Sequence, residues 1–295
     1  MVHYRWYHDL TLFPRRTLRT HIPSCDNTHC THDSFRRVQE VVSRSISSNT
    51  EEAILRDARL EIGRIKIMKH HFILSAELVR DAIPHQEYPF DLPVVKFLDK
   101  IEFHENVTFL VGENGTGKST LLEAIATQYG FNPEGGSRNF HFATQETHSC
   151  LGDFIRLAKF GKPRDGYFLR AESFYNLASD IDRLEKERPG LLIHYGDKSL
   201  HEQSHGESFF SLFMNRFGGN GIYLLDEPEA ALSPQRQLAF LIRLDELVKS
   251  GSQFIIATHS PILLAYPHAK IIQITEKGFE EIDYKTTEHY ETYRA

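Results

Sequence analysis

Short apolar runs alternate with helix-like segments from residue 107 onward. Residues 107–111, 222–225 and 254–257 are nearly continuous apolar runs, the pattern of strands buried on both faces of a parallel sheet. Residues 120–130 and 207–217 have the apolar spacing of helices. Buried strands that alternate with helices predict an α/β fold with a mostly parallel central sheet.

The region between Gly130 and Ser204 is predicted to be a helical subdomain. The patterns at 151–160 and 172–190 indicate helices, and the second helix ends at a Pro-Gly pair. No long heptad pattern interrupts the region, so a long coiled-coil arm is not expected.

Composition favours a protein that is neither secreted nor inserted in a membrane. The apolar runs are far shorter than the roughly 20 residues that cross a bilayer. Three cysteines are too few for a disulfide framework and favour a reducing compartment. We therefore expect a cytoplasmic protein with no membrane insertion.

Charge is distributed unevenly, with a change near Met68. Residues 1–67 carry 11 basic and 8 acidic residues, a balance of +3, and 10 of the 11 basic residues are arginine. Residues 68–295 carry 23 basic and 32 acidic residues, a balance of -9. We interpret 1–67 as an N-terminal extension outside the folded domain, either a mobile basic arm or a segment upstream of the native start.

Two stretches contain residue types that can bind zinc. Cys25, His29, Cys30 and His32 lie together, but their spacing matches no established ligand pattern, and a solvated polar loop is favoured. Residues 201–205 spell H-E-x-x-H, which on a continuous helix would be a zinc-hydrolase motif. Gly206 is a better residue for a helix start than for a helix interior, so the zinc interpretation is disfavoured.

The glycine-rich stretch that begins at residue 112 has the spacing of a phosphate-binding loop. It reads G-x-x-x-x-G-K-S between a predicted strand and a predicted helix, which is the context that a P-loop requires. Glycines allow the backbone to direct several N–H groups at one phosphate, and the helix N-terminus adds its positive end. Lys118 can reach the β- and γ-phosphates, and the Ser119 hydroxyl can bind Mg²⁺. The expected nucleotide-binding residues are Gly112, Glu113, Asn114, Gly115, Thr116, Gly117, Lys118, Ser119 and Thr120.

Two acids follow the predicted strand at 222–225. In open parallel sheets, ligands bind at the C-terminal ends of the strands, where Asp226 and Glu227 are placed. Asp226 is predicted to hold Mg²⁺ with Ser119, and Glu227 to act as general base or to orient water. A further predicted strand ends just before His259, which can bridge the γ-phosphate and the attacking water. Glu227, His259 and Lys118 are thus the candidate catalytic residues.

In their order, these motifs resemble those of the ABC-type ATPases, a superfamily of P-loop NTPases. GENGTGKST (112–120) is similar to the Walker A motif, SHGES (204–208) to the signature and IYLLDEPE (222–229) to Walker B. ALSP (231–234) is similar to the D-loop and THS (258–260) to the H-loop. The resemblance implies binding of ATP and Mg²⁺, and ATP hydrolysis.

The resemblance covers residues 68–295. It implies an ABC-type fold with a mostly parallel central sheet, an antiparallel β part and a helical signature subdomain at roughly 131–218. DEPEAALSP and ATHSP are more similar to soluble ATPases of the SMC, RecF and OLD type than to transporter subunits. A small stand-alone bacterial ATPase of that branch is implied.

The resemblance also implies a head-to-tail homodimer that forms with ATP. Ser204, Gly206 and Glu207 would then contact a nucleotide held by the second subunit. His205 departs from the family pattern, which has a glycine at this position.

Two elements of the family have several candidates each. The Q-loop position, which senses the metal, falls on Arg170, Glu172 or Gln145. The aromatic residue that stacks on adenine falls on Tyr88 or Phe90.

The physiological role has several alternatives beside a soluble dimerising ATPase. The chain could energise a membrane transporter, or it could be a regulatory ATPase that gates a partner protein such as a nuclease or toxin. A DNA-repair ATPase that binds duplex DNA is the third alternative, although the balance of -9 in 68–295 does not favour broad contact with a phosphate backbone. The protein partner is unidentified in each case.

Overall fold

The computed structural model describes residues 71–83, 88–137, 149–170, 174–187, 189–190, 192–195, 199, 201, 205–287 and 290. Contacts divide the chain into two units, Met1–Ile62 and Gly63–Ala295, and every described residue belongs to the second unit. The predicted extension at 1–67, together with Cys25, His29, Cys30 and His32, lies outside the described residues.

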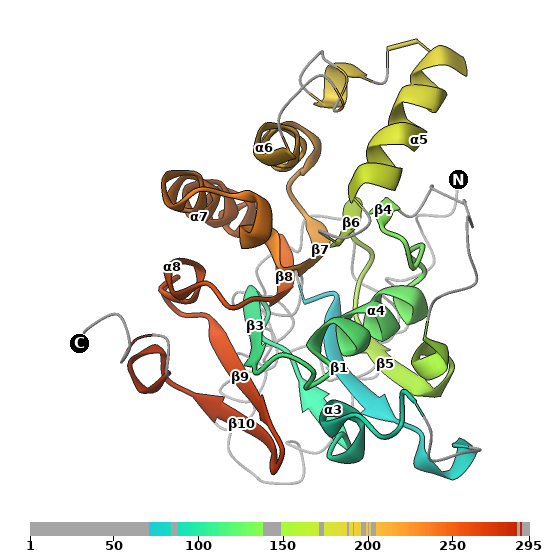
Figure 1. Ribbon diagram of the computed structural model, residues 1–295, viewed down its shortest axis with the longest axis vertical. Helices are drawn as coiled ribbons and strands as arrows, with labels where there is room; N and C mark the ends of the chain where they lie inside the picture. The colour runs from blue at the N-terminus through green and yellow to red at the C-terminus, as the bar shows by residue number, and fades with distance from the viewer. Residues whose placement is uncertain are drawn as a thin grey trace, which may run out of the picture. The chain divides into compact units, whose positions relative to one another are not determined.

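A large mixed sheet forms the centre of the second unit (Figure 1). Within the described ranges it has seven strands in the order β10-β9-β3-β8-β7-β6-β4. The strands are β10 (Gly278–Ile282), β9 (Lys270–Thr275), β3 (Val107–Gly112), β8 (Gln253–Ala257), β7 (Gly221–Asp226), β6 (Asp165–Arg170) and β4 (Gly136–Ser137). The five inner strands are parallel, while the edge strands β10 and β4 are antiparallel to their neighbours. The predicted mostly parallel sheet is confirmed.

A smaller antiparallel sheet has the order β2-β1-β5, formed by β2 (Lys100–Glu102), β1 (Ile73–Leu78) and β5 (Ile155–Lys159). The helix predicted at 151–160 is wrong, because a 3-10 turn at Cys150–Phe154 leads into strand β5. The spacing of the apolar residues in this stretch is compatible with a helix and with a strand. The stretch forms a strand because β5 pairs with β1.

Helices pack on both faces of the large sheet (Figure 1). On one face lie α4 (Lys118–Tyr129) and the small sheet. On the other face lie α5 (Phe174–Glu187), α6 (His205–Arg216), α7 (Pro234–Lys249) and α8 (Pro261–Leu264). The short helix α3 (Pro93–Lys96) packs near α4 and β9. The described helices of the predicted subdomain therefore span 174–216, whereas 131–170 contains β4, β5 and β6.

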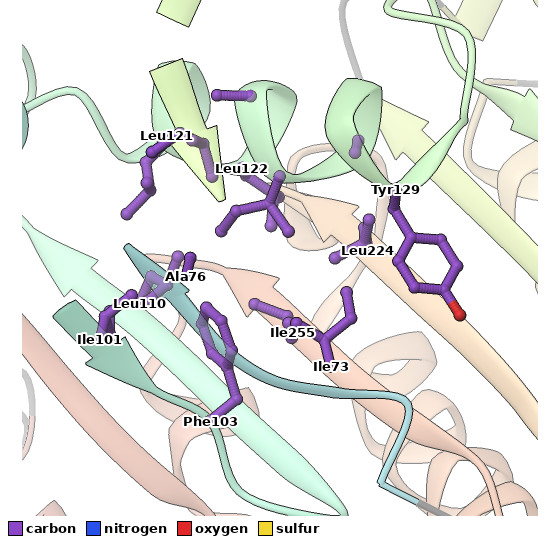
Figure 2. Packing of buried hydrophobic residues seen from close by; sticks show 14 of the residues in the cluster. Ile73, Ala76, Ile101, Phe103, Leu110, Leu121, Leu122, Tyr129, Leu224 and Ile255 are labelled. Atoms are coloured by element: carbon purple, nitrogen blue, oxygen red, sulfur yellow. The ribbon is translucent and has the colours of Figure 1, made fainter. Parts of the chain in front are cut away.

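The central strands are apolar at consecutive positions because each of their faces lines a separate core. In β3, Phe109 belongs to the core beneath α6 and α7, and its neighbour Leu110 belongs to the core beneath α4. Tyr223 and Leu224 of β7 divide in the same way. Figure 2 shows the α4 core, in which Ile73, Ala76, Ile101, Phe103, Leu110, Leu121, Leu122, Tyr129, Leu224 and Ile255 are labelled.

One buried side-chain amide connects the two sheets. Gln253, at the start of β8, accepts a hydrogen bond from the Ile73 N–H at 2.9 Å and donates to the Ile73 carbonyl at 2.8 Å. Its Nε2 also donates to the His104 carbonyl at 2.9 Å. The amide thus pairs with β1 as a neighbouring backbone would, which fixes the small sheet to the large one.

Among the residues that the structure describes, no helix combines the length and the apolar character that crossing a membrane requires.

Candidate nucleotide-binding site

The glycine-rich loop connects β3 to α4 as predicted, and two of its glycines have left-handed backbone. Gly115 has φ of +83° and Gly117 has φ of +93°, a region that residues with a side chain rarely adopt. A Cβ on Gly117 would lie 2.5 Å from the Val94 Cγ1 of α3, so the loop packs tightly on that side. Around Gly115 no atom lies within 4 Å of the Cβ position. The glycines therefore give the loop a tight inner side and an open outer side.

The remaining residues of the loop stabilise its turn. The Thr116 hydroxyl donates to the Glu113 carbonyl at 2.9 Å, and the Val94 N–H donates to the Thr116 carbonyl at 3.0 Å. Glu113 and Asn114 are exposed at the tip, while Thr120 is half-buried in the first turn of α4. Residues 112–120 thus form a compact loop and the first turn of α4, and their binding of phosphate stays a prediction.

Lys118 folds back over this loop. Its Nζ donates to the Gly112 carbonyl at 2.8 Å and to the Glu113 carbonyl at 2.9 Å. Burial lowers the Lys118 pKa, and the charges of Glu227 and Asp226 act in the opposite direction. The ammonium group is therefore held within the loop by two backbone carbonyls.

Ser119 and Asp226 meet although they are far apart in the sequence. The Ser119 Oγ donates to the Asp226 Oδ1 at 2.9 Å, which joins the first turn of α4 to the end of β7. The Asp226 residue is 6% exposed. Mg²⁺ prefers oxygen ligands and takes one or two from protein side chains when phosphates supply others. A hydroxyl and a carboxylate in contact beside a P-loop fit that preference.

Glu227 has a left-handed backbone, with φ of +47° and ψ of +52°. Such a conformation is strained for a residue with a long side chain, and strain of this kind concentrates at functional sites. The Glu227 N–H donates to the Ala257 carbonyl at 2.9 Å, which ties the turn to the end of β8. Its carboxylate is 44% exposed and its Oε1 lies 3.8 Å from the Nε2 of His259. The two predicted catalytic groups are therefore neighbours at the open edge of the sheet.

The first turn of α6 brings the predicted signature residues against the segment that follows Asp226. A Cβ on Gly206 would lie 2.4 Å from the Ala231 carbonyl oxygen, so only glycine permits this approach. Glu207 forms an exposed ion pair with Arg236 of α7 at 3.4 Å. The helix begins at His205, and Ser204 lies outside the described residues.

Two family models match the chain in the two halves of this site. A model described as an AAA ATPase domain matches residues 207–264, which include Asp226, Glu227 and His259. A model described as an AAA domain matches residues 95–185, which include the P-loop. Both halves of the site therefore match models of AAA-type ATPase domains. No protein of curated function gives a significant match.

Solved structures of ATP-binding cassettes and of SMC head domains are similar to this ATPase. The ADP form of an ATP-binding cassette from an ABC transporter is 16% identical, with a TM-score of 0.45, and covers 76% of this chain and 99% of its own. The SMC head domain from Thermotoga maritima is 18% identical, with a TM-score of 0.32, and covers 62% and 92%. A second SMC head, bound to the C-terminal winged-helix domain of ScpA, is 14% identical, with a TM-score of 0.40, and covers 72% and 97%. Because all these TM-scores are below 0.5, no conclusion about this chain follows from these similarities.

Glu229 lies at the candidate site beside His259, and the sequence interpretation missed it. Its Oε1 accepts a hydrogen bond from the backbone N–H of His259 at 2.6 Å. Burial raises the pKa of the Glu229 carboxyl, against the lowering effect of that hydrogen bond. The third acid of the sequence DEPE could have signalled this role, but an acid after Pro228 also fits a solvated turn.

The zinc interpretation of residues 201–205 is not supported by the fold of the ATPase. The helix α6 begins at His205, and His201 precedes it, with its Nε2 3.0 Å from the Ser179 Oγ. Within the part of the chain that the structure describes, no three His, Cys, Asp or Glu residues form a group that could hold a metal ion. The two histidines are not one turn apart on a single helix, as the zinc-hydrolase motif requires.

The candidates for adenine stacking and for the Q-loop position differ in their surroundings. Phe90 packs edge-on against Phe154, with ring centroids 5.1 Å apart, whereas Tyr88 is 64% exposed. Of these two aromatic residues, Tyr88 therefore has the ring open to a ligand, and its stacking stays a prediction. Arg170 ends β6 directly beside Asp226 in the sheet register, while Glu172 and Gln145 lie outside the described residues.

Proposed function

We propose that the chain hydrolyses ATP with Mg²⁺ at the C-terminal ends of β3, β7 and β8. The convergence of Lys118, the Ser119–Asp226 pair and the Glu227–His259 pair at one edge of the sheet supports this proposal most. The five residues come from three separate segments of the chain. Each has the side-chain chemistry that one part of phosphoryl transfer to water needs.

In the proposed reaction, the N–H groups of the loop and the Lys118 ammonium bind the β- and γ-phosphates. Ser119 and Asp226 hold Mg²⁺, which neutralises charge on the phosphate oxygens when it is bound. Glu227 orients the attacking water or takes its proton. His259, whose Nε2 lies 3.8 Å from the Glu227 carboxylate, bridges the γ-phosphate and the attacking water. Glu229 positions His259 through the backbone hydrogen bond.

We further propose that ATP joins two copies of the chain head to tail. The exposed Glu207 and the close-packed Gly206 stand at the N-terminus of α6, a helix end that favours anions. This helix end presents the signature residues for a nucleotide held by the second copy. Hydrolysis would then open the dimer, so that the ATP cycle becomes a switch.

The Glu227→Gln variant tests both parts of the proposal. It should bind ATP, turn it over about 10² to 10⁴ times more slowly than wild type, and accumulate as an ATP-dependent dimer in light scattering. Glu276→Gln, an exposed residue at the turn between β9 and β10, removes the same charge away from the site and is the matched control. Turnover at the wild-type rate by Glu227→Gln would refute the catalytic assignment, and a monomer that persists with ATP would refute the switch.

The trapped Glu227→Gln dimer can also be used to distinguish the transporter, gated-effector and DNA-binding roles. We propose a protein partner for the closed dimer, and affinity purification from native cells would identify it. An integral membrane protein would indicate a transporter, and a nuclease or toxin would indicate a gated effector. ATP turnover that DNA stimulates and salt suppresses would indicate the DNA-binding role.

We propose that the ATPase domain begins near residue 68 and that residues 1–67 lie outside it. In support, β1 begins at Ile73 and pairs with both β2 and β5. A chain expressed from Met68 should fold and hydrolyse ATP at the full rate, and loss of either property would refute this boundary.

A further inference from the structure

Two successive turns of α4 contact the ends of two neighbouring strands. Ser119 in the first turn contacts Asp226 at the end of β7. Four residues further, Glu123 forms an ion pair with Arg170 at the end of β6. Arg170 and Asp226 are direct partners in the parallel register of β6 and β7. The guanidinium and the proposed metal ligands therefore occupy adjacent positions along one helix and one sheet edge.

The Glu123–Arg170 pair is largely withdrawn from solvent. The side chains are 8% and 20% exposed, and the second Glu123 oxygen accepts a hydrogen bond from the Ser149 N–H at 2.8 Å. A buried ion pair contributes little net stability compared with apolar residues of the same size, because desolvation offsets the attraction. Structural stability alone is therefore a weak reason for an arginine at this strand end.

Arginine has a chemistry that distinguishes this strand end from its neighbour. A guanidinium is always charged, donates up to five N–H bonds and matches phosphate oxygens in a two-pronged geometry, but it cannot ligate a cation. Neighbouring strands lie about 4.8 Å apart, so the Arg170 backbone is one strand spacing from that of Asp226. A γ-phosphate bound by Lys118 and by a metal on Asp226 comes within reach of a long side chain anchored there.

We propose that Arg170 is a catalytic residue of the ATPase, supplied by the same subunit. In the structure, Glu123 holds the guanidinium. With ATP bound, the guanidinium moves to a γ-phosphate oxygen and stabilises the charge that develops there in the transition state. The water oxygen bonds to Pγ as the bond from Pγ to the bridging oxygen breaks, ADP keeps that electron pair, and Arg170 stays protonated throughout.

The proposal has a structural consequence at Glu123. When Arg170 turns toward the nucleotide, Glu123 loses its charged partner and keeps the Ser149 N–H. The contact between α4 and the segment that begins at Ser149 is then held by a buried carboxylate with no guanidinium. Nucleotide binding at the P-loop is thereby transmitted to that segment through a single side chain of α4. This inference rests on the proposed ATP hydrolysis.

Three variants separate a catalytic Arg170 from a structural one. Arg170→Gln alone leaves Glu123 buried and unpaired, so it should lose both stability and turnover. The double variant with Glu123→Gln removes the unpaired charge and should unfold near the wild-type temperature. Its kcat should nevertheless stay about 10³-fold below wild type, the size that a missing arginine finger produces. Arg156→Gln, an exposed arginine on β5, is the matched control.

A double variant that regains kcat to within about fivefold of wild type would overturn the inference, because the pair would then be purely structural. Calorimetric binding of AMP-PNP and of ADP, each with Mg²⁺, gives a second and independent measurement. The double variant should bind AMP-PNP roughly 10- to 100-fold more weakly than wild type, as expected for a lost charged hydrogen bond. ADP affinity should stay within twofold. Equal AMP-PNP affinities would also overturn the inference, whereas a wild-type chain without any turnover would count against the proposed function instead.

Discussion

Gly115 in the phosphate loop and Gly130 after α4 offer a matched test of the nucleotide site. Their φ angles are +83° and +104°, and a Cβ on either would have no atom within 4 Å. Gly130 follows the last residue of α4, and its N–H caps the helix by donating to the Ala126 carbonyl. Alanine at each position therefore introduces the same left-handed strain without a collision, and only Gly115 lies in the proposed cradle.

Both alanine variants should lose a similar, small amount of stability. A left-handed residue with a Cβ costs about 1–2 kcal/mol, and the reduced entropy of the unfolded chain offsets about 0.4–1 kcal/mol of this. The net loss is about 1 kcal/mol, which lowers the melting temperature of a domain of this size by roughly 2–4 °C. This part of the effect should be equal at the two positions.

Nucleotide binding should separate the two variants. At an AMP-PNP concentration of 100 times Kd, wild type gains about 2.7 kcal/mol, a shift of roughly 5–11 °C. Gly130→Ala should keep this shift. In Gly115→Ala the loop should relax from positive φ, and its N–H groups should turn away from the phosphates. If Kd becomes 100-fold weaker as a result, the stability gained from AMP-PNP at the same concentration falls to about 0.4 kcal/mol.

The assay is thermal unfolding of the three proteins with and without AMP-PNP and Mg²⁺, with Kd measured by calorimetry. A Gly115→Ala variant that retains the full ligand-induced shift would show that the backbone at this position does not direct the phosphate contacts. An equal loss of shift in Gly130→Ala would show that the effect spreads through α4 and is not local to the cradle.

Three further substitutions have defined outcomes. Gly206→Ala places a Cβ 2.4 Å from the Ala231 carbonyl oxygen, and a stability loss of about 1–3 kcal/mol with weaker ATP-dependent dimerisation is expected from urea unfolding and light scattering. Burial raises the pKa of the Glu229 carboxyl above its ordinary 4.5, so this carboxyl binds its proton more tightly in the folded state than in the unfolded state. The ionised carboxylate therefore destabilises the fold. Glu229→Gln should therefore melt higher than wild type at neutral pH, and melting curves across pH should converge as the pH falls toward 4.5. Tyr223→Phe removes a buried hydroxyl that contacts Asp165 at 2.9 Å and the adjacent loop, and a loss of about 2–3 kcal/mol in urea unfolding is expected.

The conformation of the glycine-rich loop could be predicted from sequence because its determinants are local. The glycine spacing, the strand before it and the helix after it all lie within residues 107–130, and the structure has each of them. Asp226 and Glu227 were predictable for a related reason, since a buried strand that ends in acids places them at one known edge of a sheet.

Contacts between distant segments explain what sequence interpretation missed. The stretch 151–160 has apolar residues compatible with a helix, and it becomes β5 because β1, about 80 residues earlier, offers a partner strand. The proposed role of Glu229 depends on its contact with the backbone of His259, and that of Arg170 on its contact with Glu123 of α4. Neither partner is visible in the pattern around the residue itself.

The single amide of Gln253 sets a limit on how far the chain can be shortened. A protein that begins at Met68 retains Ile73, and with it both backbone groups that this amide pairs with. In a protein that begins after Ile73, the oxygen and the nitrogen of the Gln253 amide would both lose their Ile73 partners. This amide is fully buried in β8, the central strand of the large sheet, so the loss would be costly. The first strand of the smaller sheet is therefore an obligatory part of the minimal folding unit, and fusion or deletion boundaries belong upstream of it.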